Sequence, residues 1–459
     1  MPTELNRFNL YLAACTVNIA SFALGCTMTW TSPSVPKLEE PSSWLIIDKD
    51  QASWITALFS LGTVFGPYVA GYMVSRVGRK WTLNFAVGLI ILSYVLLLLT
   101  PLTLFVEQIY ISRILSGISG GIIYTALPMY VGEVSDDQAR ASLGSFFAFF
   151  LSPGFLINYC LGPWVSYSVL AIVSLIPAIV FLVGMQFIPE TPYYLIQKKQ
   201  NDEALKSLKW LRKGVSESEV KKELDAMEVA VEEAMNNTGT VKDLFSTHGN
   251  RMGFLLSASL AAFQQTSGIN VILFYGQKIF ELTGAKFSSS ISTIIIGVVL
   301  LIAAGIAAPM ARAFGIKNCL LISGAGMTVF QSILGLYLYY HFLGYSLNGF
   351  DWLPVSCLIC YISVYAIGFG PLPWAVMAEV FPSNIKPVAS SLTVSLCYII
   401  SFILGKIFVF MEIYVNFMVF SIFCLVSFLF TIFLVPDTRG MSFQDIQNLL
   451  NKRKVSLNK

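Results

Sequence analysis

Three amide side chains lie close together in one apolar stretch of the sequence, at Gln264, Gln265 and Asn270. An amide carries hydrogen-bond donors and an acceptor at one tip, which suits a neutral ligand whose neighbouring hydroxyl groups both donate and accept. On an unbroken helix the three would lie near about 0°, 100° and 240°, so they share no face unless the helix opens. Ser267-Gly268 lies where it could open. The alternative is that these amides only join helices by hydrogen bonds.

A tryptophan that could contact the same ligand follows a sequence that should bend its helix. Trp374 comes directly after Gly370-Pro371-Leu372-Pro373, and proline interrupts the hydrogen-bond ladder of a helix. The indole ring could then pack on the apolar C–H face of a ring-shaped ligand. The alternative is a tryptophan at the membrane interface or in the core.

The elements that would position these residues are membrane-spanning helices. Of the 459 residues, 56% are hydrophobic and only 12% are charged, with a mean hydropathy of +0.70, whereas soluble domains carry roughly 25% charged residues. The apolar residues form blocks of about twenty, enough to cross a ~30 Å hydrocarbon core as helices. We predict an all-α membrane protein with twelve transmembrane helices, near residues 10–32, 54–74, 81–100, 107–130, 142–163, 165–188, 254–277, 289–310, 319–340, 352–378, 389–410 and 413–435.

The basic residues predict the orientation of these helices. Cytoplasmic segments carry an excess of Lys and Arg, and most of the 29 Lys and Arg fall in alternate segments that include both ends of the chain. The segment between the sixth and seventh spans is the most basic of these. We therefore expect a multi-pass protein with both termini in the cytoplasm.

Several other classes of protein are disfavoured by the sequence. The net charge of +3 reflects the bias between the membrane faces, and no run of basic residues resembles a nucleic-acid footprint. No Ser/His/Asp, metal-ligand or paired-carboxylate constellation lies inside the spans, so we expect neither an enzyme nor a metal or cofactor. Cys357 and Cys360 form a CxxC, but within an apolar helix, which favours packed thiols over a redox or metal site. No small-residue cleavage site follows the first span, so we expect no cleavable signal peptide.

The two halves of the chain repeat each other. Glu133-Val134 is followed by Arg140, and Glu379-Val380 is followed at the same spacing by Lys386. Ser75-Arg76-Val77-Gly78-Arg79-Lys80 has a worn counterpart in Ala311-Arg312-Ala313-Phe314-Gly315-Ile316-Lys317, and Pro189-Glu190-Thr191-Pro192 matches Pro436-Asp437-Thr438-Arg439. Three matches in the same order indicate a duplicated six-helix unit in parallel orientation, the arrangement of transporters that rock two bundles about a central site. We predict two six-helix bundles, 1–189 and 251–436, a linker with short amphipathic helices at 190–250, and a cytoplasmic tail at 437–459.

At these residues the sequence resembles the sugar porter family of the major facilitator superfamily, over nearly its whole length. The matching elements are Arg76-Val77-Gly78-Arg79-Lys80, Arg113 with Gly117, Pro128-Met129-Tyr130-Val131-Gly132-Glu133, Pro189-Glu190-Thr191-Pro192, Gln264-Gln265-Thr266-Ser267-Gly268-Ile269-Asn270, Gly370-Pro371-Leu372-Pro373-Trp374 and Pro436-Asp437-Thr438-Arg439-Gly440. The sequence Trp30-Thr31-Ser32-Pro33 looks most like the insect facilitated trehalose transporters. The resemblance implies that Gln264, Gln265, Asn270 and Trp374 bind a sugar.

The resemblance also implies a gate at the cytoplasmic ends of the helices. Similar residues in the family form ion-pair networks that hold the inner side shut, and only a network that breaks on opening would matter, because surface pairs are worth about 0–1 kcal/mol each. Simple positive-inside topology explains the basic residues but not the two repeated glutamates. The expected gating residues are Arg76, Arg79, Glu133, Arg140, Glu190, Arg312, Glu379 and Lys386.

The sequence departs from the family pattern in ways that make the expected pocket less polar. Both inner loops lack the acidic residue that the family carries there. At four further positions, in spans five, ten and eleven, the family carries Gln, Glu, Asn and Trp, and this chain carries other residues. The substituted positions are Ser75, Ala311, Ala148, Ala366, Cys397 and Tyr398. These changes weaken any specific substrate assignment and permit loss of transport.

The expected mechanism is facilitated diffusion. Proton-coupled members carry an acid within the first span, where this chain has Thr27, and a proton relay needs a titratable group inside the membrane. We place the charged residues of the spans near their ends, Arg113 among them. We expect a uniporter of trehalose or a hexose, active as a monomer in the plasma membrane, with the sugar and the lipid bilayer as partners and no nucleic acid. A sugar sensor without net flux and a facilitator of another neutral solute, such as a polyol, remain the alternatives.

Overall fold

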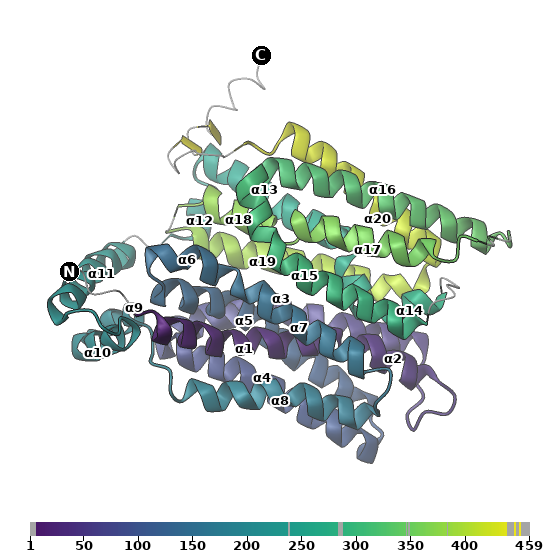
Figure 1. Ribbon diagram of the computed structural model, residues 1–459, viewed down its shortest axis with the longest axis horizontal. Helices are drawn as coiled ribbons and strands as arrows, with labels where there is room; N and C mark the ends of the chain where they lie inside the picture. The colour runs from purple at the N-terminus through teal and green to yellow at the C-terminus, as the bar shows by residue number, and fades with distance from the viewer. Residues whose placement is uncertain are drawn as a thin grey trace.

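The computed structural model describes residues 6–236, 239–282, 288–345, 347, 349–382, 384–437, 445–446 and 449–450. The first six-helix bundle is built from α1 Phe8–Thr29, α2 Thr31–Glu39, α3 Lys49–Val77, α4 Arg79–Thr103, α5 Val106–Val134, α6 Asp137–Gly144, α7 Phe146–Leu161 and α8 Tyr167–Met185. The second consists of α13 His248–Thr266, α14 Ile269–Leu282, α15 Ser289–Phe314, α16 Ile316–Phe342, α17 Leu353–Ile367, α18 Leu372–Val380, α19 Lys386–Ile407, the short 3-10 helix Phe408–Phe410 and α20 Ile413–Phe433. Figure 1 shows the two bundles side by side, with their helices along the long axis of the molecule.

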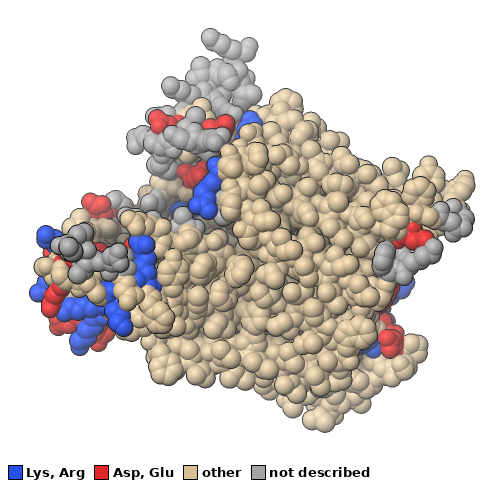
Figure 2. Space-filling view, viewed as in Figure 1, with Lys and Arg blue, Asp and Glu red and all other residues tan. Residues whose placement is uncertain are grey.

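The membrane-crossing elements agree with the twelve predicted spans. In the described part of the chain, eleven helical stretches are long and apolar enough to cross a membrane. The seventh predicted span is the interrupted pair α13 and α14. Neither of these two helices alone is both long and apolar enough to be counted among the eleven. Figure 2 shows an uncharged central band, with Lys, Arg, Asp and Glu gathered at the two ends of the view. This distribution is what a protein that crosses a bilayer requires, because a charge is costly in hydrocarbon.

The segment between the bundles forms four helices, α9 Pro192–Gln197, α10 Asn201–Leu211, α11 Glu217–Asn236 and α12 Val241–Leu244. The Ser216 hydroxyl caps the start of α11, because it accepts from the backbone N–H of Glu219 at 3.4 Å and donates to the Glu219 carboxylate at 2.9 Å. Leu208, Leu224 and other apolar residues of α9, α10 and α11 pack into a small core of their own. The helices are therefore amphipathic, as their spacing predicts.

The linker helices lie at one end of the molecule and are attached to the first bundle. The side chain of Asn9, at the start of α1, donates to the carbonyl oxygen of Trp210 at 2.7 Å. The guanidinium of Arg212 donates to the carbonyl oxygen of Val134 at 3.0 Å and forms an ion pair with Glu223. The start of α1 and the end of α5 thus lie on the linker side, which we call the inner end, at the left of Figure 1. The opposite end is called the outer end.

Helices of the first bundle approach each other at glycine pairs. Gly62 of α3 faces Gly117 of α5 so closely that a Cβ added at Gly117 would lie 2.1 Å from the carbonyl oxygen of Phe59. Gly25 of α1 faces Gly154 of α7 in the same way. Small residues at such contacts let two helix backbones pack directly, which is a principal source of association energy inside a membrane.

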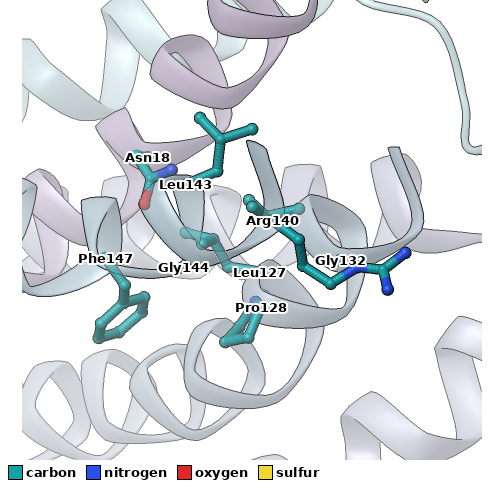
Figure 3. A pocket seen from close by; sticks show the side chains of 9 residues that line it. Asn18, Leu127, Pro128, Gly132, Arg140, Leu143, Gly144 and Phe147 are labelled. Carbon is teal, nitrogen blue, oxygen red and sulfur yellow. The ribbon is translucent and has the colours of Figure 1, made fainter. Parts of the chain in front are cut away.

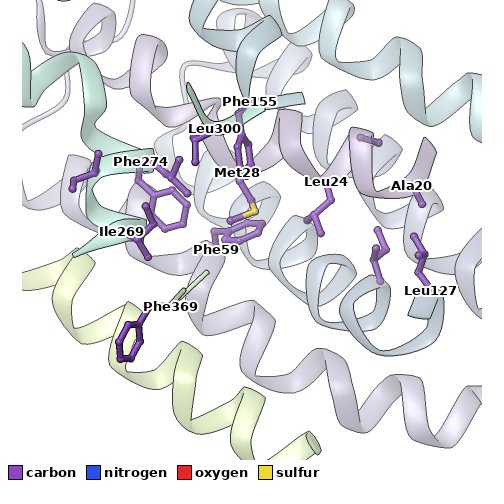
Figure 4. Close-up of a cluster of buried hydrophobic side chains, with 14 of the residues drawn as sticks. Ala20, Leu24, Met28, Phe59, Leu127, Phe155, Ile269, Phe274, Leu300 and Phe369 are labelled. Carbon is purple, nitrogen blue, oxygen red and sulfur yellow. The ribbon is translucent and has the colours of Figure 1, made fainter. Parts of the chain in front are cut away.

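Aromatic and aliphatic side chains fill the space where the two bundles meet. Phe59 of α3 and Phe274 of α14 contact edge to face, with their ring centroids 5.9 Å apart. Figure 4 shows these two rings among residues from both halves, including Met28 and Ile269. The core is thus continuous from one bundle into the other.

Candidate functional site

The helix that carries the amides is broken at the predicted position. α13 ends at Thr266, Gly268 has φ = +84°, and α14 begins at Ile269. This backbone conformation suits glycine, and a Cβ on Gly268 would lie 2.5 Å from the Phe420 ring. The carbonyl oxygen of Ser267, freed by the break, accepts from the Tyr361 hydroxyl at 2.9 Å and the Gln331 amide at 2.6 Å. The break is therefore a built feature with satisfied polar groups.

The break brings two of the predicted amides into contact. The side-chain N–H of Asn270 donates to the Gln265 carbonyl oxygen at 2.7 Å, and Gln265 donates to the Cys397 sulfur at 3.0 Å. Asn270 also donates to the Ser401 hydroxyl at 2.9 Å. Both amides are buried, so their hydrogen bonds fix their orientation.

The third amide connects this break to the second one in the same bundle. Between α17 and α18 the chain leaves the helical path, as the Gly-Pro-Leu-Pro sequence predicts. The Gln264 side chain donates to the carbonyl oxygens of Phe369 and Gly370, at 2.8 and 2.7 Å. Backbone carbonyls that lost their helical partners are thus satisfied by an amide from the other interrupted helix.

The predicted aromatic residue lies beside these amides, at the junction of the bundles. Trp374 is half-buried and packs on a small cluster that contains Val64 of the first bundle and Val394, Cys397 and Tyr398 of the second. Tyr124 of α5 packs on the same cluster, with its ring centroid 5.8 Å from that of Tyr398. Cys397 and Tyr398 stand where family members carry Asn and Trp, so this part of the site presents rings and a thiol.

Two residues that sequence reasoning missed join this site to the other bundle. The hydroxyl of Ser401 on α19, which receives the Asn270 N–H, lies 2.9 Å from the hydroxyl of Ser60 on α3. Both serines are buried. A small polar residue in each of two apolar spans is the only signal in the sequence, and nothing there pairs them.

The site is suited to binding and not to acid–base chemistry. Its polar groups are amides, hydroxyls and a thiol, which can exchange hydrogen-bond partners with a neutral ligand at no cost in buried charge. Arg113 lies in the first third of α5 and is fully buried. Its guanidinium donates to the carbonyl oxygens of Thr27 at 2.7 Å and Ile55 at 3.2 Å. The acid missing at Thr27 is thus replaced by backbone oxygens.

A cavity of about 140 Å³ lies towards the inner end of the first bundle, away from the amides. Figure 3 shows side chains from α1, α5, α6 and α7 around it, with the guanidinium of Arg140 at its rim. Its lining is mostly apolar. Of the predicted residues this cavity contains only Arg140, and none of the four predicted sugar-binding residues lines it.

At the inner end, several predicted gating residues form one network within the first bundle. The guanidinium of Arg79 forms an ion pair with Glu133 at 2.6 Å and donates to Gln197 of α9 at 3.1 Å. The second carboxylate oxygen of Glu133 accepts from the Thr191 hydroxyl at 2.6 Å. The pair is largely buried, so losing either partner would leave an uncompensated charge. These contacts join α4, α5 and the start of the linker.

Glu190 belongs to the same network. Its carboxylate accepts the backbone N–H of Lys80 at 3.0 Å and that of Thr191 at 2.8 Å. Burial raises the pKa of this carboxyl, although these hydrogen bonds and the nearby Arg79 oppose the shift. The Lys80 ammonium donates to the carbonyl oxygen of Ile188 at 2.7 Å.

Four further predicted gating residues lie on other helix ends. Arg76 is exposed, with its guanidinium 4.9 Å from the centre of the Tyr72 ring. Lys386 donates to the carbonyl oxygen of Ala378 at 3.1 Å. Arg312 is exposed on the last turn of α15, and Glu379 is half-buried on α18. The structure thus gathers Arg79, Glu133 and Glu190 into one network.

Ion pairs between the bundles close the outer end, and sequence reasoning did not anticipate them. The Lys278 ammonium on α14 contacts the Glu39 carboxylate on α2 at 2.6 Å. The Lys406 ammonium on α19 contacts Asp50 on α3 at 2.5 Å and the Ser53 hydroxyl at 2.7 Å. The isolated charges at the ends of these spans were visible in the sequence, but their partners lie in the other half of the chain.

Fold and site together define a membrane transporter built from two six-helix bundles around a neutral polar site. The family model described as sugar (and other) transporter matches residues 5–450. The chain belongs to this sugar (and other) transporter family.

Known proteins agree with this membership. The chain is 32% identical over 447 residues to the facilitated trehalose transporter Tret1 of Bombyx mori, covering 95% of this chain and 86% of that protein. It is 32% identical over 460 residues to the facilitated trehalose transporter Tret1-2 homolog of Drosophila simulans, covering 98% and 93%. A structure of the xylose transporter XylE from E. coli in a partially occluded inward open conformation matches with a TM-score of 0.79 at 20% identity, over 94% of this chain and 99% of that one. That likeness shows a shared fold.

Proposed function

We propose that this protein is a uniporter that carries a small neutral sugar, trehalose or a hexose, down its concentration gradient by alternating access. The observation that carries the proposal is the meeting of two interrupted helices, α13–α14 and α17–α18, at Gln264, Gln265 and Asn270. Interrupted helices at the interface of repeated bundles are where such transporters bind their substrates. Relatives that cover nearly the whole chain are trehalose transporters.

The charge inventory supports passive transport. The guanidinium of Arg113 is held by the backbone oxygens of Thr27 and Ile55 and stacks 5.0 Å from the centre of the Phe59 ring. A proton-coupled cycle would need a carboxylate that gains and loses a proton at the middle of the membrane. Glu133, a largely buried acid of the first bundle, lies at the inner end, where it contributes to gating.

The proposed setting is the plasma membrane, with the protein acting as a monomer and both termini in the cytoplasm. Arg7 and the linker helices, which carry many of the basic residues, lie at one end of the molecule. An excess of Lys and Arg marks the cytoplasmic face. The gate of the proposal comprises Arg79, Glu133 and Glu190, with Arg76, Arg140, Arg312, Glu379 and Lys386 around the same inner mouth.

The test is uptake of radiolabelled trehalose, glucose, fructose and polyols in cells that lack their own transporters. Gln265→Ala and Asn270→Ala should each lower sugar uptake at least about tenfold at equal surface expression, because about 1.4 kcal/mol is within the value of a hydrogen bond to a buried group. A non-metabolised sugar should reach equal internal and external concentration, and a protonophore should leave the initial rate unchanged. Accumulation that collapses with the proton gradient would contradict uniport.

A sugar sensor without net flux is the second candidate. It is favoured by the apolar character of the pocket, where Tyr124 and Tyr398 pack together between the bundles and Ala148 and Ala366 replace polar residues of the family. Sugar that protects the purified protein against thermal unfolding, together with no uptake in vesicles, would favour the sensor. Uptake of polyols but not sugars would instead identify another neutral solute.

A further inference from the structure

The hydroxyl group of Ser401 connects three helices at the centre of the molecule. It accepts the side-chain N–H of Asn270 on α14 at 2.9 Å, and it lies 2.9 Å from the Ser60 hydroxyl on α3. Ser401 itself belongs to α19, and it is buried with the other two residues. One oxygen therefore contacts both the proposed sugar site and the opposite bundle.

In this conformation the side-chain nitrogen of Asn270 has no donor left for a ligand. An amide nitrogen carries two hydrogens. One points to the carbonyl oxygen of Gln265 and the other to Ser401. A sugar hydroxyl that accepts from this nitrogen must first replace one of these partners, and the Ser401 oxygen is the partner from another membrane span.

The position of Asn270 is coupled to the outer end of the molecule. Asn270 lies in the first turn of α14, directly after the break at Gly268, so α14 is not continuous with α13. The first bundle holds α14 through the Thr31 hydroxyl, which donates to the Phe274 carbonyl oxygen at 3.1 Å, and through the ion pair of Lys278 with Glu39. Separation of the bundles at the outer end must break these contacts and withdraw Ser60 from Ser401.

We propose that Ser401 competes with the transported sugar for Asn270 whenever the outer end is closed, so that the site facing the cytoplasm binds sugar more weakly than the site facing outwards. Closure brings α3, α14 and α19 together at Ser401, and the Asn270 N–H turns from the substrate to the protein. Opening of the outer end releases Asn270 to bind. The inference rests on the proposed function, because it assigns Asn270 to the sugar. Ser401 acts here as a positioning residue through Asn270.

The experiment measures the sugar concentration for half-maximal flux separately for entry and exit. Purified protein in vesicles of known orientation is assayed with radiolabelled trehalose and, in parallel, radiolabelled glucose. The wild-type exit KM should exceed the entry KM. The exit Vmax should be larger by the same factor, because Vmax/KM of a passive carrier must be equal in both directions. Ser401→Ala should lower the exit KM about two- to tenfold, the value of one hydrogen bond, and leave the entry KM unchanged.

The matched control is Ser395→Ala on the same helix. The Ser395 hydroxyl also contacts the first bundle, at the Val64 carbonyl oxygen and the Tyr68 hydroxyl, both at 3.1 Å, but it does not contact Asn270. This variant should keep the wild-type ratio of the two KM values. Ser401→Thr, which retains the hydroxyl, should also keep it. Ser401→Cys, whose sulfur is a weak acceptor, replaces the alanine variant if that does not fold and should also lower the exit KM; an unchanged exit KM would refute the competition.

Each outcome distinguishes the inference from the proposed function. If Asn270→Ala abolishes transport but Ser401→Ala leaves the exit KM unchanged, the competition is refuted and the sugar site stands. Equal shifts of the entry and exit KM would make Ser401 an ordinary contact of the sugar, which also refutes it. Wild-type flux in Asn270→Ala would remove Asn270 from the site, and absence of any sugar flux in the wild type would overturn the proposed function.

Discussion

The inner ends of the two bundles share one backbone plan but carry different side chains. Gly78 between α3 and α4 and Gly315 between α15 and α16 have φ values of +93° and +81°. Lys80 donates to the carbonyl oxygen of Ile188, and its counterpart Lys317 donates to that of Ile432. Arg79, however, corresponds to Ile316. The duplication therefore preserved the turn and the lysine, while only the first bundle has the Arg79–Glu133 pair.

The bundles also differ in how their helices approach each other. A Cβ added at Gly117 in the first bundle would lie 2.1 Å from the backbone of α3 at Phe59, whereas one added at Gly335 of α16 would lie 3.1 Å from the Met418 side chain and 3.3 Å from its backbone nitrogen. The second bundle also contains the breaks that carry the amides of the candidate site. Because the helix breaks lie in the second bundle, we expect it to deform more easily than the first.

The largest expected effect concerns helix packing. Gly117→Ala would place a Cβ 2.1 Å from the Phe59 carbonyl oxygen, and backbone atoms cannot move aside as a side chain does. Overpacking usually costs about 1–3 kcal/mol, and more where nothing can relax, so this variant should yield little folded protein in size-exclusion chromatography. Gly335→Ala meets the Met418 Cγ at 3.1 Å and the Met418 backbone nitrogen at 3.3 Å, contacts that a small shift relieves, and should lower the yield much less. Similar yields would disprove the difference in packing.

The next effect concerns the buried ion pair. Arg79→Ala leaves the Glu133 carboxylate without its partner, and breaking a buried pair costs about 3–5 kcal/mol. The melting temperature of the purified protein should fall clearly. Ile316→Ala, at the corresponding position of the second bundle, shortens one half-buried apolar side chain and should lower it less. A larger loss in Ile316→Ala would show that the network does not stabilise the first bundle.

Two smaller effects test a feature that both bundles share, the lysine that follows the glycine turn. Lys80→Ala removes a hydrogen bond of 2.7 Å from a half-buried ammonium, and Lys317→Ala removes one of 3.2 Å from a more exposed group. The first should cost about 1 kcal/mol and the second less. Thermal unfolding of both variants in the same detergent measures this. Loss of stability in Lys317→Ala alone would contradict the order.

The smallest effect is the pH dependence at Glu190. Because burial raises the pKa of its carboxyl in the folded protein, folding favours the protonated form. This contribution to stability is fully present below the ordinary carboxyl pKa of about 4.3 and is lost as pH rises through the raised value. Wild type should therefore gain thermal stability relative to Glu190→Gln as pH falls from about 7 to 5. A gap that is constant with pH would count against a raised pKa.

The parts of the site that depend on neighbouring residues could be predicted from the sequence. The break at Ser267-Gly268 follows from a glycine beside amides that could not otherwise share a face, and the bend before Trp374 follows from two prolines. The repeated turn at Gly78 and Gly315 was visible from the matched spacing of the halves. In each case the chemical reason lies within a few residues.

The contacts between the bundles could not be predicted. Ser60 and Ser401, or Asp50 and Lys406, are separated by more than half the chain, and a single sequence contains nothing that pairs them. The full burial of Arg113 could not be predicted either, because hydropathy marks where a span lies but not how completely one side chain is enclosed. The number of spans could be predicted better than the contacts between them, since the length of a hydrophobic stretch is a local property of the sequence.

The ion pairs at the outer end have a consequence for the medium in which the protein works. Lys406 and Asp50 are in contact, but the Asp50 side chain is 58% exposed, so dissolved ions reach it, and the Debye length is only about 8 Å at physiological ionic strength. External electrolyte should therefore weaken the closed outer end, while the same salt inside should not reach these pairs. In the proposed orientation, the ionic composition of the fluid at the outer face should therefore act as an effector of one conformation.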